Sequence, residues 1–296
     1  MKKKLVALFF CLMAQSTIFA CASCTSGGDE FLILYPHEQV KAYIGLNHQW
    51  GFKNILANGK TGHSLGPTYK DTFVFAGAVR ATQDLFFSFG SSAVRNARPP
   101  RSGYGLGDTF FNGRFTLLPQ AIESPWIPQI QLLFGGKLAT GRSIQNSNDT
   151  QMLDVSGTGF DELKSGLDIW FGVAALKFGV AQSLLYSFEQ HNKQRSIQKG
   201  LGLRTTLSAA WRSSHIDFWQ ITGGIARDSK ENTRINGRSI RDSHELSYSF
   251  FIANEFYLPT QTDTLRVLYA NQGNIFYNSN TSKLHSVTFS WIKQLL

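Results

Sequence analysis

Beyond its N-terminal segment, the chain has no long run of apolar residues. A transmembrane helix needs about 18 to 20 consecutive apolar residues, so the sequence excludes a helical membrane protein. Amphipathic helical periodicity is also absent, although a soluble enzyme of 296 residues usually shows it. If the mature chain crosses a membrane, it must do so as a closed β-barrel, because only helices and closed barrels satisfy their backbone polar groups in lipid.

The signatures of common enzymes are missing as well. There is no G-x-S-x-G, no H-E-x-x-H and no phosphate-binding P-loop. His215 and Asp217 would share one face of a strand, but no nucleophile accompanies them, and a hydrogen-bonded pair in a lumen is the simpler interpretation. The other histidines are scattered near expected strand ends and loops: His37, His48, His63, His191, His244 and His285. We therefore expect no catalytic residue, no cofactor and no metal site.

Cysteine is scarce, with three in the whole chain. Cys11 lies in the N-terminal apolar stretch, whereas Cys21 and Cys24 form a C-x-x-C. Three alternatives remain open: lipidation of Cys21, a disulfide in an oxidising compartment, or a soft-metal or redox site that lacks a second C-x-x-C. Cleavage after Ala22 would instead remove Cys21 and leave Cys24 as a lone thiol.

The N-terminus has the three parts of a secretory signal peptide. Lysines follow Met1, an apolar stretch of about ten residues comes next, and small and polar residues continue to Ala22. The apolar stretch is too short to span a bilayer. We predict a cleaved signal peptide at 1–22, a periplasmic segment at 23–38 and the folded domain at 39–296.

What the chain does contain is a succession of alternating, aromatic-rich segments. Phe (24) and Gly (27) are abundant, and apolar and polar residues alternate with the period of two that is typical of a half-exposed strand. We expect twelve strands, an even number as in single-chain bacterial barrels. They are placed at 39–51, 68–80, 84–95, 103–118, 127–140, 161–173, 177–189, 200–212, 215–227, 244–257, 264–272 and 284–294.

The connectors between these segments alternate between long and short. Long polar connectors such as 141–160 and 228–243 follow the odd-numbered strands, and compact turns such as 81–83 and 174–176 follow most even-numbered ones. From a periplasmic N-terminus, this rhythm puts the long loops outside the cell and the turns inside. The predicted fold class is all-β: an antiparallel transmembrane β-barrel of about twelve strands after a cleaved signal peptide.

Within single strands, an apolar face separates from a polar one. In the segment 244–257, the apolar face is Leu246, Tyr248, Phe250 and Ile252 and the polar face is Glu245, Ser247, Ser249 and Glu255; in 284–294, the apolar face is Val287, Phe289 and Trp291 and the polar face is Ser286, Thr288 and Ser290. In 103–118, the apolar face is Phe111, Phe115 and Leu117 and the polar face is Asp108, Asn112, Arg114 and Thr116; in 200–212, the apolar face is Leu203, Leu207 and Trp211 and the polar face is Arg204, Ser208 and Arg212. The polar faces hold mostly small residues instead of the dense charge of a soluble sandwich, which favours a barrel with a narrow lumen. Aromatic residues near strand ends would form interfacial girdles: Trp50, Trp126, Trp211, Tyr257 and Trp291.

Charged residues on the polar faces are the candidates for the lumen. They are Asp108, Arg114, Lys137, Lys164, Asp168, Arg204, Arg212, Asp217, Glu245 and Glu255, together with Lys177. If their ion pairs close the lumen, the barrel is structural; if they leave it open, the barrel is a pore for small solutes. Twelve strands lie between the filled eight-stranded barrels and the open sixteen-stranded porins, so strand number leaves both alternatives open.

The formal net charge is +9, and basic residues concentrate in the predicted external loops. The expected basic rim consists of Arg95, Arg98, Arg101, Arg142, Arg195, Arg234, Arg238 and Arg241. Because Arg binds phosphate in a bidentate way, this rim would contact the phosphates of lipopolysaccharide in the outer membrane; a solvated loop surface without a partner is the alternative. An exported chain meets no nucleic acid in ordinary function. The sequence determines neither the solute nor the oligomeric state.

The stretch 105–118, which reads G-L-G-D-T-F-F-N-G-R-F-T-L-L, resembles the outer-membrane barrels grouped as meta-pathway phenol-degradation proteins. The barrel pattern extends this resemblance over the whole mature chain. It implies an outer-membrane barrel of a Gram-negative bacterium that moves small hydrophobic or aromatic compounds, and it supplies no catalytic residue. The chain departs from such barrels in ending with Leu295 and Leu296 instead of an aromatic residue.

The expected function is therefore a porin-like channel or transporter for small solutes, hydrophobic or aromatic ones among them. The alternative is a non-transporting barrel that acts as a surface enzyme, or as an envelope-structural or adhesion protein presenting basic loops. An enzyme would need a nucleophile and a base that converge at one rim, and a structural barrel would have a lumen filled by side chains.

Overall fold

The computed structural model describes residues 34, 38–62, 67–119, 127–173, 175–192, 195–212, 219–258, 262–273, 276 and 278–295. The predictions for the signal peptide, for Cys21 and Cys24, for Trp126 and for the pair His215 and Asp217 lie outside these residues. Within the described part of the chain, no helix is both long enough and apolar enough to cross a membrane.

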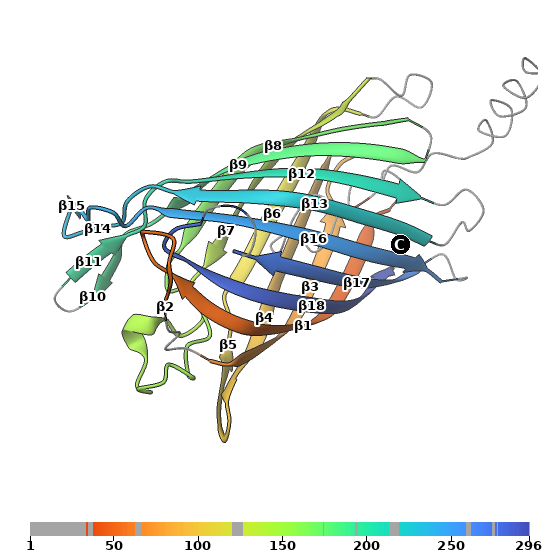
Figure 1. Ribbon diagram of the computed structural model, residues 1–296. Coiled ribbons are helices and arrows are strands. Elements are labelled where there is room, and N and C mark those ends of the chain that lie inside the picture. The colour runs from red at the N-terminus through yellow and green to blue at the C-terminus, as the bar shows by residue number, and fades with distance from the viewer. Residues whose placement is uncertain are drawn as a thin grey trace, which may run out of the picture.

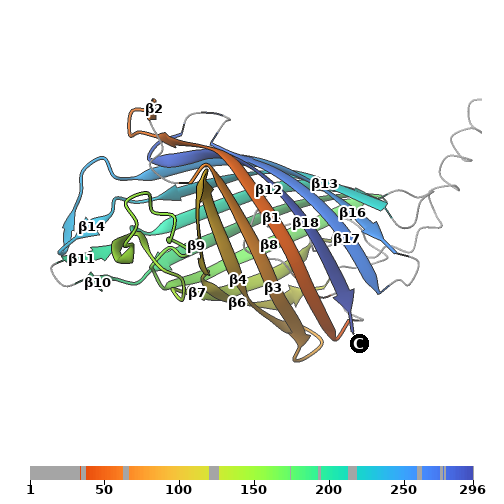
Figure 2. The same ribbon diagram turned by 90° about the horizontal axis from the view of Figure 1, so that it is seen from below.

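Twelve long antiparallel strands form a closed barrel, so the predicted fold class is confirmed. They are β1 (Val40–Ile55), β3 (Tyr69–Arg80), β4 (Leu85–Arg98), β6 (Thr109–Leu118), β7 (Gln129–Leu138), β8 (Glu162–Val173), β9 (Leu176–Ser187), β12 (Gly202–Arg212), β13 (Trp219–Lys230), β16 (Glu245–Tyr257), β17 (Asp263–Gln272) and β18 (Thr281–Gln294). The last strand closes on the first, with pairs from Lys41 with Gln294 to Ile55 with Thr281, and Figure 2 shows β1 beside β18.

The predicted strand at 103–118 is two strands in the structure. β5 (Arg101–Leu106) pairs with β4 alone, whereas β6 pairs with both β4 and β7, and Gly107 and Asp108 separate the two. β5 keeps its pairing with β4 past this break but does not pair with β7, and the Ser156 hydroxyl of the loop after β7 donates to the Leu106 carbonyl. The exposed apolar positions change from Tyr104 and Leu106 on β5 to Phe111 and Phe115 on β6, so the alternation changes phase at the break, and the single predicted strand did not take account of this change.

Several short elements lie at the end of the barrel where the long connectors are. β2 (Thr61–Gly62) pairs with β1, and η1 (Ile144–Asn146) is a single turn of 3-10 helix. A separate sheet of β10 (Gln190–Asn192), β11 (Arg195–Gln198), β14 (Arg234–Ile235) and β15 (Arg238–Ser239) projects beyond the barrel (Figure 1). We call this the loop end, and the opposite end, where the C-terminus lies, the turn end.

The predicted alternation of long and short connectors holds except after β4. The connectors after β1, β7, β9, β13 and β17 lie at the loop end, because every strand runs antiparallel to its neighbours. The connector between β4 and β5 lies there too, but it consists only of Pro99 and Pro100, whereas a longer one at 96–102 was predicted. The tight turns, such as Ala81–Asp84 between β3 and β4, lie at the turn end. Antiparallel neighbours thus bring loops that are far apart in sequence to one mouth.

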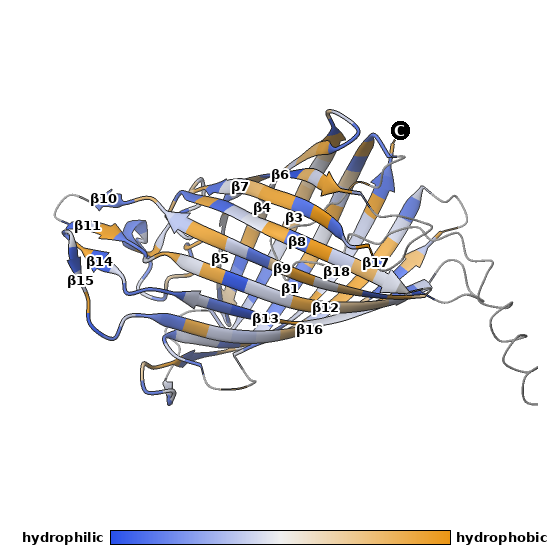
Figure 3. Ribbon diagram, turned by 90° about the horizontal axis from the view of Figure 1, so that it is seen from above, coloured by the Kyte–Doolittle hydropathy of each residue, from blue (hydrophilic) through white to orange (hydrophobic). Residues whose placement is uncertain are grey.

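Exposure alternates along the strands as the two-face pattern predicts. On β12 the side chain of Leu207 is 55% exposed and that of Ser208 is 7% exposed, and on β18 Phe289 is 57% exposed and Ser290 is 8% exposed. Figure 3 shows apolar and polar residues in alternation along the strands. A continuous apolar surface of this kind is unfavourable in water and suits lipid, so the buried polar face is the inner one.

Candidate functional site in the lumen

A buried ion pair lies on the inner wall formed by β6, β7 and β8. Arg114 donates through Nη1 to Asp168 Oδ2 at 2.7 Å and to Gln131 Oε1 at 3.0 Å. The side chains of Arg114 and Asp168 are 3% and 0% exposed. Removing one partner of such a pair leaves a buried charge without compensation, so this wall depends on both residues.

The wall on the opposite side carries a second charged cluster. Glu255 Oε1 on β16 lies 3.5 Å from Arg266 Nε on β17, and Gln220 Nε2 and the Tyr257 hydroxyl donate to Glu255 Oε2, each at 3.3 Å. The Arg212 guanidinium lies 5.3 Å from the centroid of the Tyr257 ring. Tyr257 is therefore on the inner face with Glu255, and its expected place in an outer girdle is wrong, whereas Trp50, Trp211 and Trp291 keep the parity of the outer face.

Three further ion pairs lie toward the loop end. Lys137 pairs with Glu162 at 2.8 Å, Arg204 with Asp228 at 3.0 Å, and Lys230 with Glu245 at 3.6 Å. Lys199, just before β12, belongs to the same region: burial lowers the pKa of Lys199, and the Lys230 ammonium lowers it further. Four cations and three anions named here therefore lie close together at the loop end of the lumen.

The five ion pairs described above run along the wall, and none of these five crosses the lumen. Each joins adjacent strands, except Arg114 with Asp168, which spans β6 to β8 past β7. Inward aromatic rings also lie along the wall: a Cβ at Gly179 would lie 2.5 Å from the Trp170 ring, and one at Gly224 would lie 2.6 Å from the Phe251 ring. Glycine lets each ring lie flat on its neighbour strand, an arrangement that the sequence analysis did not foresee.

The predicted lumen residues are placed as follows. Eight of them have the parity of the inner face: Arg114, Lys137, Lys164, Asp168, Arg204, Arg212, Glu245 and Glu255. Asp108 lies at the mouth just before β6, and Asp217 lies outside the described residues. The sequence analysis missed several of their partners: Gln131, Glu162, Gln220, Asp228, Lys230 and Arg266. Strand parity could have found Glu162 and Arg266, whereas Asp228 and Lys230 were assigned to a loop.

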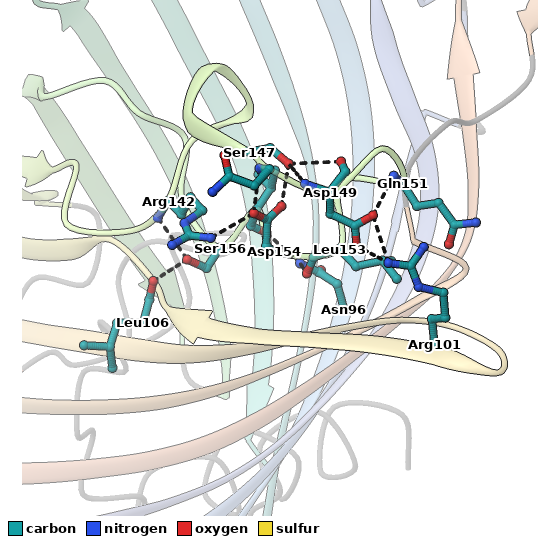
Figure 4. Close-up of polar contacts among 12 residues, drawn as sticks. Asn96, Arg101, Leu106, Arg142, Ser147, Asp149, Gln151, Leu153, Asp154 and Ser156 are labelled. Carbon is teal, nitrogen blue, oxygen red and sulfur yellow. Dashed lines mark hydrogen bonds and ion pairs between the residues drawn. The ribbon is translucent and has the colours of Figure 1, made fainter.

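One long connector, residues 139–161, folds back against the inner face of the β4–β5 hairpin (Figure 4). We call it the mouth loop. Asn96 Nδ2 on β4 donates to the carbonyl oxygens of Leu153 at 3.1 Å and Val155 at 2.6 Å, and the Ser156 hydroxyl donates to the Leu106 carbonyl at 2.5 Å. Leu153 is 1% exposed. The mouth loop is therefore a packed part of the lumen.

Two glycines on β5 make this packing possible. A Cβ at Gly103 would lie 2.4 Å from the Leu153 carbonyl oxygen, and a Cβ at Gly105 would lie 2.7 Å from the Ser156 hydroxyl. A side chain of any size at either position would push the mouth loop away. Gly105 opens the G-L-G-D stretch of the sequence, which therefore has a structural purpose.

Two carboxylates order the mouth loop, Asp108 from just before β6 and Asp154 from within the loop. Asp108 accepts hydrogen bonds from the Gly141 amide at 3.2 Å, the Thr158 amide at 2.8 Å and the Thr158 hydroxyl at 2.9 Å. Asp154 accepts from the Ser147 hydroxyl, from the Asn148 amide at 3.0 Å and from Arg142 Nη1 at 2.9 Å. These bonds, that of Ser147 first, hold the pKa of Asp154 well below its ordinary value.

A cavity of about 290 Å³ lies beneath the mouth loop. Its walls are inner-face residues of β3, β4, β6, β7, β8 and β9, and Val155 to Thr158 of the mouth loop complete it. Lys70, Lys137 and Lys164 contribute the cations of the lining, and Asp108 and Glu162 contribute the anions. Within the described residues, no group of three or more His, Cys, Asp or Glu side chains is arranged to hold a metal ion.

The arginines of the expected basic rim have different environments. Arg101 pairs with Asp149 at 3.3 Å and Arg142 with Asp154, so both hold the mouth loop. Arg95 lies 3.7 Å from Asp71 on the outer face and 5.8 Å from the Tyr104 ring centroid, and Arg98 ends β4. The other four arginines of the expected rim are exposed. Arg195, Arg234 and Arg238 lie on the projecting sheet, and Arg241 comes just after its last strand, β15.

Among solved structures, this chain is similar to outer-membrane barrels. The COG4313 outer membrane channel from Pseudomonas putida F1 is 10% identical, with 93% of this chain and 99% of that chain covered and a TM-score of 0.66. The translocator domain of the autotransporter NalP from Neisseria meningitidis is 9% identical, covering 99% and 94%, with a TM-score of 0.48. The KdgM porin is 8% identical, covering 86% and 99%, with a TM-score of 0.46. The first of these supports the barrel fold. No family model and no curated protein matches the chain.

Proposed function

We propose that this chain is an outer-membrane channel of a Gram-negative bacterium, through which small solutes pass a mouth narrowed by residues 139–161. The observation that carries the proposal is that the five ion pairs described above, and the rings of Trp170 and Phe251, lie along the wall of the lumen. Such pairing satisfies the inner charges without closing the bore, whereas a structural barrel would be filled by side chains that meet across it. The likeness to a channel in overall fold and the apolar outer face add support.

The resemblance to the meta-pathway phenol-degradation barrels remains a proposal at the level of family and solute. Its support is that the G-L-G-D stretch has a defined task here: Gly105 makes room for the mouth loop and Asp108 holds it. Small hydrophobic or aromatic compounds are the solute class that the resemblance implies.

Single-channel recording of the refolded protein in a planar bilayer tests the proposal. We expect a small conductance for the intact chain and a larger one after residues 143–156 are replaced by a short glycine linker, because the mouth loop narrows the lumen. The matched control shortens the hairpin 234–239, which lies outside the barrel and should leave the conductance unchanged. The absence of conductance from both the intact and the shortened chain would show a plugged, structural barrel.

We also propose that the exposed arginines of the projecting sheet bind lipopolysaccharide phosphates. Arg195, Arg234 and Arg238 are all exposed there, and guanidinium groups suit phosphate in charge and geometry. Replacing all three by Gln should weaken binding of purified lipopolysaccharide and reduce its dependence on salt. Unchanged binding would leave a solvated surface as the better interpretation.

A further inference from the structure

A row of stacked rings crosses the outer face of the barrel near the loop end. Its members come from the adjacent strands β3, β1, β18 and β17, and in spatial order they are Tyr69, His48, Trp50, His285 and Tyr269. Neighbouring centroids lie 5.5 to 6.3 Å apart, and the ring planes differ by 19 to 27°. On the side toward the turn end, the outer face exposes apolar side chains such as Leu46, Phe73 and Phe289. Rings that carry polar atoms are typical of the boundary between lipid and water, so the row marks the level at which the hydrocarbon ends.

Just beyond this row, toward the loop end, β1 contains a bulge. Between the pair made by Trp50 and the pair made by Lys53, three steps along β1 match two steps along β18. Gly51 permits the bulge, because its φ of 73° lies in the region that favours glycine. If the strands paired without a bulge, Phe52 would lie opposite Lys283 on the outer face, and Lys53 would point inward. The bulge therefore replaces an apolar side chain on the outer face by a cationic one.

The result is that two lysines lie directly opposite each other. Lys53 is paired with Lys283 across β1 and β18, which lie side by side in Figure 2. Directly opposite residues have Cβ atoms about 4.5 to 5.5 Å apart, and like charges at this spacing are destabilising. Neither lysine forms an ion pair with the residues that the structure describes. Asp71, a carboxylate of the same outer face, is engaged by His48 at 2.6 Å and by Arg95 at 3.7 Å. A bound anion would relieve the repulsion between the two lysines.

The level of the lysine pair indicates which anion this is. Lys283 lies two residues from His285 along β18, which is about 7 Å toward the loop end at the usual rise of a strand. The phosphates of a membrane lipid lie just beyond the level at which its hydrocarbon ends. We expect the loop end to face the cell exterior, and the lipid of that leaflet is lipopolysaccharide, whose lipid A carries phosphate monoesters.

We propose that Lys53 and Lys283 form a binding site on the barrel wall for a phosphate of lipid A, whose acyl chains lie along the apolar outer face below the row of rings. The inference rests on the proposed location of the barrel in an outer membrane, with the loop end outside. The site is separate from the exposed arginines of the projecting sheet, because it lies on a strand pair of the barrel itself.

Native mass spectrometry of the refolded, detergent-solubilised protein tests the site with purified lipid A. We expect lipid A to bind, and lipid A without its phosphates to bind at least about tenfold more weakly because the anion is lost. Phosphatidylglycerol should also bind at least about tenfold more weakly, because its phosphate diester carries one charge and a monoester carries nearly two. Equal binding of lipid A with and without phosphates would overturn the site. Equal binding of phosphatidylglycerol would overturn lipopolysaccharide as its occupant.

Variants locate the binding. Each is made in a protein whose projecting-sheet arginines are already replaced by Gln, so that binding there does not mask the effect. Lys53→Gln and Lys283→Gln should each lower the affinity for lipid A about tenfold, and Lys53→Arg should retain most of it because the charge remains. The matched control is Lys60→Gln, in the exposed turn that follows β1 at the same end of the barrel, which should bind as its parent does. If Lys53→Gln folds as a barrel and binds lipid A with unchanged affinity, the lysine pair is not the site.

Stability in lipid-free detergent separates a binding role from a structural one. Lys53→Gln should be at least as stable as its parent, because it removes one of two opposed like charges. Lipid A should raise the melting temperature of the parent more than that of the variant, because only the parent binds it tightly. A variant that is less stable without lipid would mean that the lysines already have compensating partners, and would overturn the proposal.

The binding and conductance measurements fail separately. Binding of lipid A at the lysine pair by a barrel that does not conduct would retain the site and overturn the channel. Conduction by a barrel whose lysine variants bind lipid A unchanged would retain the channel and overturn the site.

Discussion

The outer and inner faces of this barrel obey different rules, although they are built from alternate residues of the same strands. On the outer face, Leu207, Leu265 and Phe289 are exposed and share only the property of being apolar. On the inner face, Arg114 has a defined partner in Asp168, and Gly103 a defined neighbour in Leu153. Lipid accepts many apolar side chains, whereas each inner polar group needs its own partner.

This difference means that substitutions on the two faces should fail for different reasons. A polar residue on the outer face costs its desolvation, whichever residue stands beside it. A change on the inner face costs whatever its particular partner loses. Four experiments test the comparison, in order of decreasing expected effect.

The largest effect is expected from breaking the buried ion pair. Asp168→Ala should lower the free energy of unfolding by about 3 to 5 kcal/mol, because Arg114 would remain charged and buried without its partner. Equilibrium unfolding in urea from lipid vesicles measures the loss. The double variant Arg114→Met with Asp168→Leu should recover much of it, and a double variant as unstable as the single one would mean that the charge is not the cause.

The next effect contrasts the two faces at adjacent positions. Leu207→Arg should cost roughly 2 to 4 kcal/mol of barrel stability, because the charge enters the middle of the lipid face, and Ser208→Arg should cost much less. The same unfolding assay applies, and Phe250→Arg with Ser249→Arg repeats the contrast on β16. Equal losses within each pair would show that the faces are wrongly assigned.

A smaller effect is expected where the mouth loop touches the wall. Gly103→Val should displace the loop, because a Cβ there meets the Leu153 carbonyl, and such overpacking typically costs about 1 to 3 kcal/mol. Hydrogen exchange of the amides in residues 143–156 should become faster. Tyr104→Val, one residue along and directed outward, is the control and should leave that exchange unchanged.

The smallest effect concerns pH. The pKa of Asp154 is lowered in the folded loop. The Asp154 carboxylate therefore stabilises the folded loop fully at pH values above its ordinary pKa of 3.8, and this stabilisation is lost only as the pH falls through the lowered pKa. Exchange protection of the mouth loop, corrected for the intrinsic rate, should therefore be the same at pH 7 and pH 5. Asp154→Asn should reduce the protection at both pH values. A loss between pH 7 and pH 5 in the unchanged protein would point to another titrating group.

Several features of the barrel follow from local patterns, which is why the sequence predicted them. Alternation is a property of neighbouring residues in an extended chain, so Phe289 and Ser290 could be assigned to opposite faces without knowing their neighbours. The lengths of connectors such as 81–83 and 141–160 are equally local, and they were enough to separate the two ends.

Partners across strands were harder to predict. Arg266 and Glu162 had the right parity, yet which carboxylate or cation each would meet depends on the register between strands. Asp228 and Lys230 were assigned to the polar connector 228–243, whereas in the structure β13 continues through them and pairs with β12 and β16. Tyr257 was predicted to lie in an outer girdle because it is near a strand end. It shares parity with Glu255 and therefore faces the lumen.

By itself, the sequence determined the barrel, its two faces and its two ends. The reason is that the two-residue alternation of apolar and polar side chains and the spacing of turns are properties of consecutive residues. Only the tertiary structure decided that residues 139–161 fold inward, that Gly103 and Gly105 receive them, and that Lys70 and Lys164, far apart in the chain, line one cavity. The physical reason is closure: antiparallel pairing around a complete ring brings distant strands and loops to one mouth, and no local pattern records which of them will meet there.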